Sequence, residues 1–323
     1  MKFKLIKLAT AVSVGLLSAS TTWAAWPDDK PIEVIVGYAP GGGTDLMARK
    51  LLPFVQKRLS PKAQFIVVNK PGAGGELANG YVARAKADGY TLAVVNMPGF
   101  FFQPMTKKTQ YQTEDFSLIA RAVDDPTILA VRADSKLTSL QGLIAQSKQN
   151  PGSISFGHNG TATNGDLAIR MLSKAAGVEL NSVPYKGTAA QKTDLLGSHL
   201  DVAVVSAGEV PELHDGAKGQ LRGLVQFTNK RTDVLPQVQS TGEAKVPVLM
   251  SSERGFAAPK GVSAEIIKKL ELAIAEALKD PDFLGNSTDD KVISFMLGSQ
   301  WEKSMEQAKK NMQPLADSMP KNQ

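Results

Sequence analysis

Residues 32–59 read IEVIVGYAPGGGTDLMARKLLPFVQKRL, and this stretch indicates the fold class of the chain. Apolar residues alternate at its start, which predicts a strand over 32–37. A glycine-rich loop follows over 37–43, with Thr44 at the expected N-cap of a helix and Asp45 in its first turn. Apolar residues then recur at helical spacing, at Ala48, Leu51, Leu52, Val55 and Leu59. The stretch therefore predicts a strand, a flexible loop and a helix in that order.

The same order of elements returns along the rest of the chain. A strand over 65–68 leads through loop 69–75 into a helix, and a strand over 90–95 ends in a Gly/Pro loop at 96–99. Further strands are predicted near 128–132, 153–156, 181–185, 200–205, 221–227 and 255–259, and helices near 139–148, 164–176, 188–197, 208–216, 263–279 and 297–318. This alternation predicts an α/β fold with largely parallel sheets, and a length of 323 residues favours two domains.

The N-terminus has the layout of a cleavable secretory signal over residues 1–24. Three lysines precede an apolar run from Leu8 to Ala19, and small residues at Thr22 and Ala24 suit a signal peptidase. We expect the mature chain to begin near Ala25 and to be exported to the periplasm. The alternative is an uncleaved anchor, although the apolar run is shorter than the roughly 18 residues that a membrane span needs.

Charge and cysteine content exclude several classes of protein. The formal charge of +6 falls to +3 without the three lysines of the signal, and no concentrated basic stripe remains for nucleic acid. The chain has no cysteine, so it has no disulfide, no thiolate metal site and no cysteine nucleophile. The balance is compatible with a small anionic ligand.

Known catalytic motifs are missing. The run Gly41-Gly42-Gly43 lacks the lysine of a phosphate loop and the spacing of a dinucleotide fingerprint, and no Gly-x-Ser-x-Gly occurs. The three histidines have no metal-binding spacing, so we expect no metal and no cofactor. An alternative reading is a secreted hydrolase or isomerase that uses His158 with Asp45 or Asp166.

Glycine-rich loops at successive strand ends point to a binding site for an anion. Free N–H groups at a helix start, reinforced by the helix dipole, can bind a carboxylate or phosphate, and glycine lets the ligand approach the backbone. Loops 37–43 and 69–75 each contain three or more glycines and each precede a helix. Tight turns alone would also explain these glycines.

Several landmarks resemble one known family over nearly the whole mature chain. They are Trp26-Pro27, Pro40-Gly41-Gly42-Gly43-Thr44-Asp45, Asn69-Lys70-Pro71-Gly72-Ala73-Gly74-Gly75, Ala87-Asp88-Gly89-Tyr90, Asn150-Pro151-Gly152, Val183-Pro184-Tyr185-Lys186-Gly187 and Arg231 with Leu235-Pro236. In this order they are similar to the Bug-type periplasmic solute-binding receptors of tripartite tricarboxylate transporters.

This resemblance implies a two-lobed periplasmic-binding-protein fold, type II-like, with a hinge. Lobe one would comprise 25–127 plus 254–323 and lobe two 128–253, each a mostly parallel sheet flanked by helices. The implied function is capture of a small organic anion and its delivery to a two-subunit membrane carrier, by a receptor expected to be a monomer that binds no nucleic acid. A receptor that signals to a membrane sensor is the alternative on the same fold.

The resemblance also implies which residues contact the ligand, without any catalytic residue among them. They are Tyr38, Ala39, Gly41, Gly42, Gly43, Thr44, Asp45, Gly72, Ala73, Gly74, Gly75, Pro98 and Phe101 in lobe one, and His158, Asn159, Thr161, Thr163, Asn164, Tyr185, Lys186, Gly187, Thr188 and Ser206 in lobe two.

Three departures from the family pattern bear on selectivity. The second-lobe loop reads Asn159 to Asp166 where the family usually has a Gly/Ser-rich loop and a histidine, and Glu253-Arg254 replaces an aromatic pair. The run Phe100 to Phe102 replaces small residues. We predict that at least one of these rings faces the cleft and favours an aromatic or apolar-bodied acid; the alternative is that the rings cap the core and the hinge side of lobe one. We also predict that Lys186 meets a distal carboxylate, with a solvated turn lysine as the alternative.

Overall fold

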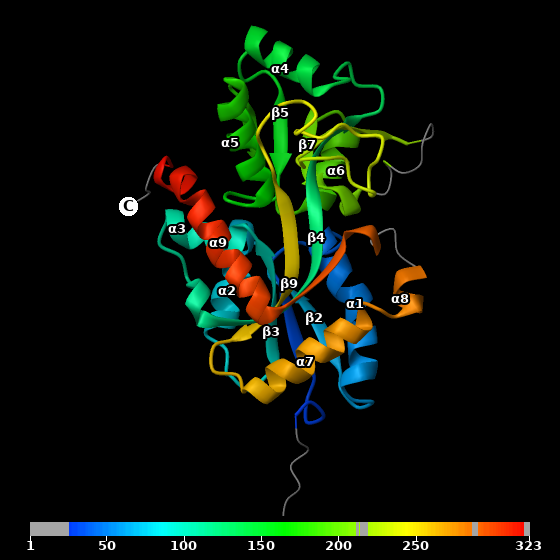
Figure 1. Ribbon diagram of the computed structural model, residues 1–323, viewed down its shortest axis with the longest axis vertical. Helices are drawn as coiled ribbons and strands as arrows, with labels where there is room; N and C mark the ends of the chain where they lie inside the picture. Colours follow the sequence, from blue (N-terminus) through cyan, green and yellow to red (C-terminus); the bar gives the residue numbers. More distant parts are fainter. Residues whose placement is uncertain (1–25, 211–212, 214–218, 286–289, 320–323) are drawn as a thin grey trace, which may run out of the picture.

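In a computed structural model, the chain folds into two lobes joined by strands that cross between them (Figure 1). The structure describes residues 26–210, 213, 219–285 and 290–319. The predicted signal peptide, 1–24, lies outside the described residues. In the described ranges, no helix combines the length and apolar character needed to cross a membrane.

Lobe one follows the predicted order of strand, loop and helix. Strand β1 lies between β2 and β3 and pairs parallel with both, so that Val34 stands opposite Val67 and Leu92. The elements of lobe one are β1 (Ile32–Val36), α1 (Gly43–Leu59), β2 (Phe65–Asn69), α2 (Glu76–Ala83), β3 (Thr91–Met97) and α3 (Gly99–Thr106), with α7 (Ala264–Ala277) and α9 (Gly298–Asp317) from the end of the chain.

Lobe two repeats this arrangement on a smaller sheet. Strand β5 pairs parallel with β6 and β7. The elements of lobe two are α4 (Leu140–Gln149), β5 (Ser155–His158), α5 (Asn164–Ala176), β6 (Asn181–Pro184), α6 (Thr188–Leu196), β7 (Val202–Ser206) and β8 (Leu221–Gln226). The helix predicted at 208–216 begins as a 3₁₀ turn at Ala207–Glu209, and most of its remainder lies outside the described residues.

Two long strands, β4 (Phe116–Arg132) and β9 (Ser251–Pro259), cross between the lobes and pair antiparallel. The sequence predicted only their ends, from 128 and from 255. The stretches Asp124-Asp125-Pro126 and Ser251 to Arg254 carry polar residues typical of loops, which hid the rest of each strand. In the structure these polar side chains lie where the lobes meet.

Two short elements near the end of the chain were also not predicted. They are α8 (Pro281–Gly285) and β10 (Ile293–Leu297), which pairs antiparallel with β4. Pro281 is the first residue of α8, where the N–H that proline lacks has no helical partner. These elements place α8 beside α1 (Figure 1).

Alternating residues of the central strands feed two hydrophobic clusters on opposite faces of the sheet. Val34 of β1 packs in the cluster that contains Leu51 of α1 and Ile274 of α7. Ile35, the next residue, packs in the cluster that contains Trp301 of α9. Full burial of one such side chain stabilises the fold by about 1.5–3 kcal/mol, and all five of these residues are at most 1% exposed.

Two local placements were wrong, namely the loop predicted for Phe100 to Phe102 and the N-cap of α1, whereas the burial of the three rings agrees with the alternative that they belong to the core of lobe one. Phe100, Phe101 and Phe102 lie in helix α3 instead of a loop, and all three are at most 2% exposed. A helix distributes consecutive side chains around its axis, so three adjacent rings can all reach the interior between β3 and α9. The N-cap of α1 is Gly42 and not Thr44, because Asp45 accepts the Gly41 N–H and closes the turn earlier.

Candidate functional site

The glycine-rich loops of the two lobes meet at one seam between them. The Ala39 N–H donates to Lys186 O across the seam (3.2 Å). Gln103 of α3, 1% exposed, donates to Gly74 O in its own lobe (3.1 Å) and to Thr161 O in the other (3.4 Å). Because these loops follow the carboxyl ends of parallel strands, the seam lies where ligands bind in open α/β sheets.

At the start of α1, hydrogen bonds to the buried Asp45 carboxylate stabilise the first turn. The carboxylate accepts the Gly41 N–H (3.0 Å), Arg49 Nε (2.9 Å) and Asn69 Nδ2 (2.9 Å), and Asp45 is 2% exposed. No side chain caps the helix at Gly42. The first-turn amides therefore face the seam with the positive end of the helix dipole.

At the start of α5, Asp166 has the same role. It accepts the Ala162 N–H (2.7 Å) and Arg170 Nε (3.0 Å) and is 1% exposed. Asn164, the first residue of the helix, donates from Nδ2 to Thr127 Oγ1 on β4 (2.8 Å). Asp45 and Asp166 both bind backbone and arginine of their own lobe, so they stabilise the turn that precedes each helix.

His158 lies at the end of β5, below this second loop. Its Nδ1 contacts Gly160 O (2.9 Å), and the residue is 2% exposed. Burial lowers the pKa of His158, against the nearby Asp166 that raises it. The ring is therefore neutral at neutral pH, and its contact with Gly160 O stabilises the loop between β5 and α5.

Close approach of the lobes requires glycine at particular positions. A Cβ at Gly74, whose φ is +64°, would lie 2.9 Å from Thr161 O, and a Cβ at Gly160 would lie 3.0 Å from the Gly74 Cα. A Cβ at Gly43 would lie 2.3 Å from Glu209 Oε1 of lobe two. The glycines of the seam thus admit backbone and side chains of the opposite lobe.

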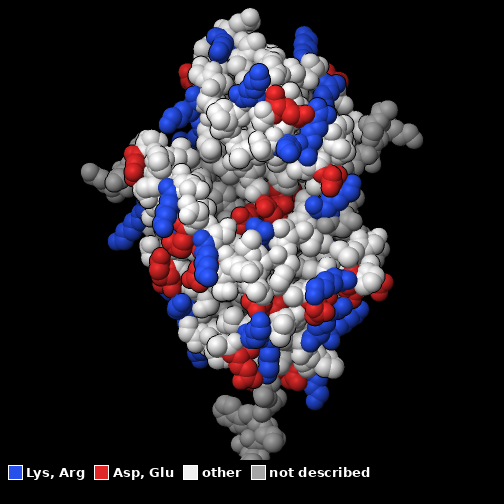
Figure 2. All heavy atoms as spheres, in the orientation of Figure 1, with Lys and Arg blue, Asp and Glu red and all other residues white. Residues whose placement is uncertain are grey.

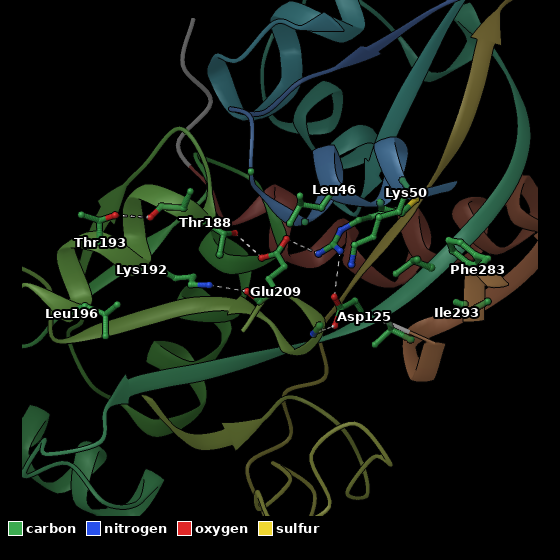
Figure 3. A pocket seen from close by; sticks show the side chains of 18 residues that line it. Leu46, Lys50, Asp125, Thr188, Lys192, Thr193, Leu196, Glu209, Phe283 and Ile293 are labelled. Carbon is green, nitrogen blue, oxygen red and sulfur yellow. Dashed lines mark hydrogen bonds and ion pairs between the residues drawn. The ribbon is translucent and has the colours of Figure 1, made fainter. Parts of the chain in front are cut away.

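A buried charge cluster forms the floor of the seam. Arg254 of β9 pairs through Nη2 with Glu209 Oε1 (2.7 Å) and through Nη1 with Asp125 Oδ2 of β4 (3.3 Å), as Figure 3 shows for the two carboxylates. Thr188 Oγ1 donates to Glu209 Oε2 (2.6 Å) and the Gly208 N–H donates to Asp125 Oδ1 (3.0 Å). Sequence reasoning missed this cluster, although the charges of Glu253-Arg254 before the apolar Phe256-Ala257-Ala258 were a signal.

The contact of Ala39 with Lys186 and Gly187 separates two cavities of similar size. The first, about 340 Å³, lies between α1, α6 and α8, and we call it the α6 cavity (Figure 3). The second, about 350 Å³, includes Tyr38 and Tyr185, and we call it the tyrosine cavity. Both are bounded by loops of the two lobes.

The structure distributes the predicted site residues over these cavities. The tyrosine cavity is lined by Tyr38, Gly72, Ala73, Gly74, Asn159, Thr161, Tyr185 and Lys186, and the α6 cavity by Gly41, Gly43 and Thr188. The other predicted residues of the loops lie in the loops, strand ends and helix starts around the cavities: Ala39, Gly42, Thr44, Asp45, Gly75, His158, Thr163, Asn164, Gly187 and Ser206.

Pro98 and Phe101 border a third cavity, of about 520 Å³, on the other side of β4 and β9. Asp124 and Glu253 line it, whereas Asp125 and Arg254, their neighbours in sequence, line the α6 cavity. Figure 2 shows a hollow with acidic and basic side chains where the strands cross. Because successive side chains of a strand point to opposite faces, β4 and β9 direct charged side chains into both the α6 cavity and the third cavity.

Two tyrosines, one from each lobe, line the tyrosine cavity, and each donates a hydrogen bond within its own lobe. Tyr38 OH donates to Gly74 O (3.2 Å), and Tyr185 OH donates to Asp194 Oδ2 (2.8 Å). Burial is the main cause that raises the pKa of Tyr185 to about 12, and the hydrogen bond and negative charge of Asp194 raise it further. Burial also raises the pKa of Tyr38. Within the described residues, no three His, Asp or Glu side chains gather as a metal site would require.

Sequence comparison finds one family over most of the chain. Residues 47–316 match the family described as tripartite tricarboxylate transporter family receptor, TctC. The UPF0065 protein in gbd 5'region of Cupriavidus necator is 34% identical over 272 residues, covering 84% of this chain and 81% of that protein. Protein BugT of Bordetella pertussis is 33% identical over 280 residues, covering 85% and 82%.

Structural comparison finds the same fold in periplasmic proteins. A structure described as a periplasmic transporter has a TM-score of 0.82 and 28% identity, covering 92% of this chain and 99% of its own. The periplasmic binding protein BugD has a TM-score of 0.81 and 27% identity, covering 88% and 96%. These similarities extend over both lobes and therefore include the seam.

Proposed function

Because the chain belongs to the tripartite tricarboxylate transporter family of receptors, we propose that it captures a small carboxylate-bearing metabolite in the seam between its lobes. It is a solute-binding receptor for a transporter of this type. We further propose that it works in the periplasm as a monomer and delivers the metabolite to a carrier of two membrane subunits. The family and fold are those of periplasmic binding proteins.

The observation that carries the proposed ligand class is the uncapped start of α1. Its first-turn amides face the seam at Gly43 and Thr44, and Asp45 holds the turn from the opposite side. A carboxylate there would meet N–H donors and the positive end of the helix dipole. Gly72, Ala73 and Gly74 line the tyrosine cavity and offer a second set of backbone donors, whereas the Gly75 N–H already donates to Gly72 O.

We propose no reaction for this site. Both carboxylates that could serve as a base near the loops, Asp45 and Asp166, accept hydrogen bonds from backbone and arginine. The task of such a site is to bind and release, and closure follows from the ligand's preference for the closed lobes. We place the hinge where β4 and β9 cross, near 125–128 and 250–255, with lobe one at 25–127 plus 254–323 and lobe two at 128–253.

Calorimetric titration of the mature protein with mono-, di- and tricarboxylates tests the proposal, with Gly74→Val as the critical variant. A Cβ at Gly74 would lie 2.7 Å from Gln103 Nε2, which itself contacts both lobes, and 2.9 Å from Thr161 O of the other lobe, so a side chain there would keep the lobes apart. We expect affinity for the best ligand to fall by about 100-fold, equivalent to about 2.7 kcal/mol.

Gly177→Val is the matched control. Gly177 ends α5 with a φ of +63°, against +64° for Gly74, and a Cβ there meets no atom within 4 Å. Both variants carry the same backbone strain, of about 1–2 kcal/mol, but only Gly74→Val blocks the seam. Equal affinities of the two variants, or no binding of any carboxylate by the wild type, would refute the proposed function.

A further inference from the structure

The α6 cavity combines apolar walls with basic side chains from both lobes. Leu46 on α1 and Leu196 on α6 face it from opposite lobes, and Phe283 of α8 and Ile293 of β10 close its end (Figure 3). We infer that this cavity receives the body of the ligand and selects organic acids with an aliphatic or aromatic body. The inference rests on the proposed function and names the ligand class of the same cleft.

The exposure of the two leucines is the first argument. Leu46 is 42% exposed and Leu196 37% exposed, although both line a cavity between lobes. When an apolar group covers apolar side chains that are exposed to water in a concave site, removal of their surface from water lowers the free energy of the complex. Because one leucine belongs to each lobe, a ligand body between them would also stabilise the closed form.

The second argument is the contrast with the tyrosine cavity. That cavity has nearly the same volume, about 350 Å³ against about 340 Å³, but glycines, tyrosines, Lys107 and Lys186 dominate its lining. A polar, glycine-lined cavity suits water or a short polar acid. Ligand pockets with apolar walls and few fixed polar groups suit larger organic ligands.

Lys50 of α1 and Lys192 of α6 supply basic groups to the α6 cavity, whose polar lining also includes the ion-paired Asp125, Glu209 and Arg254. Both line it, one from each lobe, and Lys192 Nζ donates to Glu209 O (3.4 Å). An ammonium group carries three N–H donors, so it can bind a ligand carboxylate in addition to its protein partners. The acid group of the ligand would meet these lysines beside the start of α1, with the body among the apolar walls.

Titration with phenylacetate, hexanoate and succinate tests the inference on the mature protein. We expect the wild type to bind phenylacetate or hexanoate at least tenfold more tightly than succinate. Leu46→Gln and Leu196→Gln should each weaken that binding about tenfold and change succinate binding less than twofold. Leu272→Gln is the control, because Leu272 is a leucine of α7, 51% exposed, outside the cavity.

A lysine comparison locates the ligand within the cleft. Lys192→Met should weaken binding of the preferred acid by at least tenfold, since a hydrogen bond to a charged group contributes that much. Lys186→Met removes the lysine of the tyrosine cavity that the sequence alone assigns to a distal carboxylate. If the ligand occupies the α6 cavity, the effect of this substitution on affinity should be smaller than that of Lys192→Met. A larger effect of Lys186→Met than of Lys192→Met would overturn the inference.

The outcomes separate this inference from the proposed function. Tighter binding of succinate than of either apolar-bodied acid, with no response to the leucine variants, would overturn the inference and leave a carboxylate receptor. Failure of the wild type to bind any organic acid would refute the proposed function, and the inference with it.

Discussion

The start of α1 in lobe one and the start of α5 in lobe two carry the same hydrogen bonds on different sequences. Gly41 and Ala162 both have positive φ, +80° and +63°, and both donate their N–H to an aspartate four residues later. Each aspartate also accepts from an arginine four residues further on, at Arg49 and Arg170. The two lobes therefore hold their first helical turns by one device.

The first two residues after Gly41 and after Ala162 differ in what they present to the seam. In lobe one they are Gly42 and Gly43, which leave the backbone amides uncovered. In lobe two they are Thr163 and Asn164, and both side chains bond within their own lobe or to β4, to Gly160 O (2.7 Å) and Thr127 Oγ1 (2.8 Å). The comparison teaches that the shared device fixes the backbone, while the residues beside it decide which lobe offers donors to a ligand.

The largest expected effect is on stability, from removing the aspartates. Asp45→Ala should lower the free energy of unfolding by about 3 kcal/mol and Asp166→Ala by about 2 kcal/mol, since a buried donor left unsatisfied costs about 1–3 kcal/mol. Asp45 has three hydrogen-bond partners against two for Asp166. Urea denaturation measures both values, and Asp134→Ala, at an exposed ion pair, should leave the midpoint unchanged. A larger loss for Asp166→Ala would break the proposed ranking of the two turns.

The next effect is on ligand affinity, from changing the residues between the anchors. Gly43→Val places a side chain 2.3 Å from Glu209 Oε1 and covers the first-turn amides, so we expect a loss of about 100-fold, or about 2.7 kcal/mol. Asn164→Ala removes one hydrogen bond inside the closed lobes and should cost less than tenfold. Calorimetric titration with the best carboxylate from the screen compares them. If Asn164→Ala reduced ligand affinity as much as Gly43→Val, the backbone N–H groups of lobe one would not be the main donors to the ligand.

The smallest effect concerns pH, and it should appear in lobe two only. Burial lowers the pKa of His158 below its ordinary value of 6.5, so the unfolded chain binds the proton more readily than the folded one. The free energy of unfolding should therefore fall as the pH drops below about 6.5, with this residue contributing at most about 1.4 kcal/mol per pH unit. Urea denaturation between pH 5 and 8 should show a shallower fall for His158→Gln. Identical slopes would exclude His158 as the cause.

Local pattern was sufficient for most of the elements that surround the seam. The helix predicted over 164–176 is α5 with the same bounds, and strand 65–68 is β2 with one more residue. Such elements depend on the spacing of apolar residues within one turn or one pleat, which the sequence contains in full. The glycine loops at the strand ends were predicted for the same reason, because turns need glycine locally.

The strands β4 and β9 could not be read in this way. Asp125 and Arg254 are at most 4% exposed, yet each stands in a polar stretch that resembles a loop. Their burial is possible only because β9 places Arg254 beside Asp125 of β4 and because Glu209 arrives from lobe two. No spacing along the chain records a pairing between residues 45 to 129 positions apart.

The sequence by itself determined the βα order, the glycine loops and the resemblance to a receptor family, because all three depend on residues close together in the chain or on landmarks in fixed order. Tertiary structure alone decided that Phe100 to Phe102 are buried, that Arg254 joins Asp125 to Glu209, and that the seam holds two cavities of different polarity. Those features arise where segments distant in sequence approach one another, and the energy of a buried charge or ring depends on the neighbours that packing brings to it.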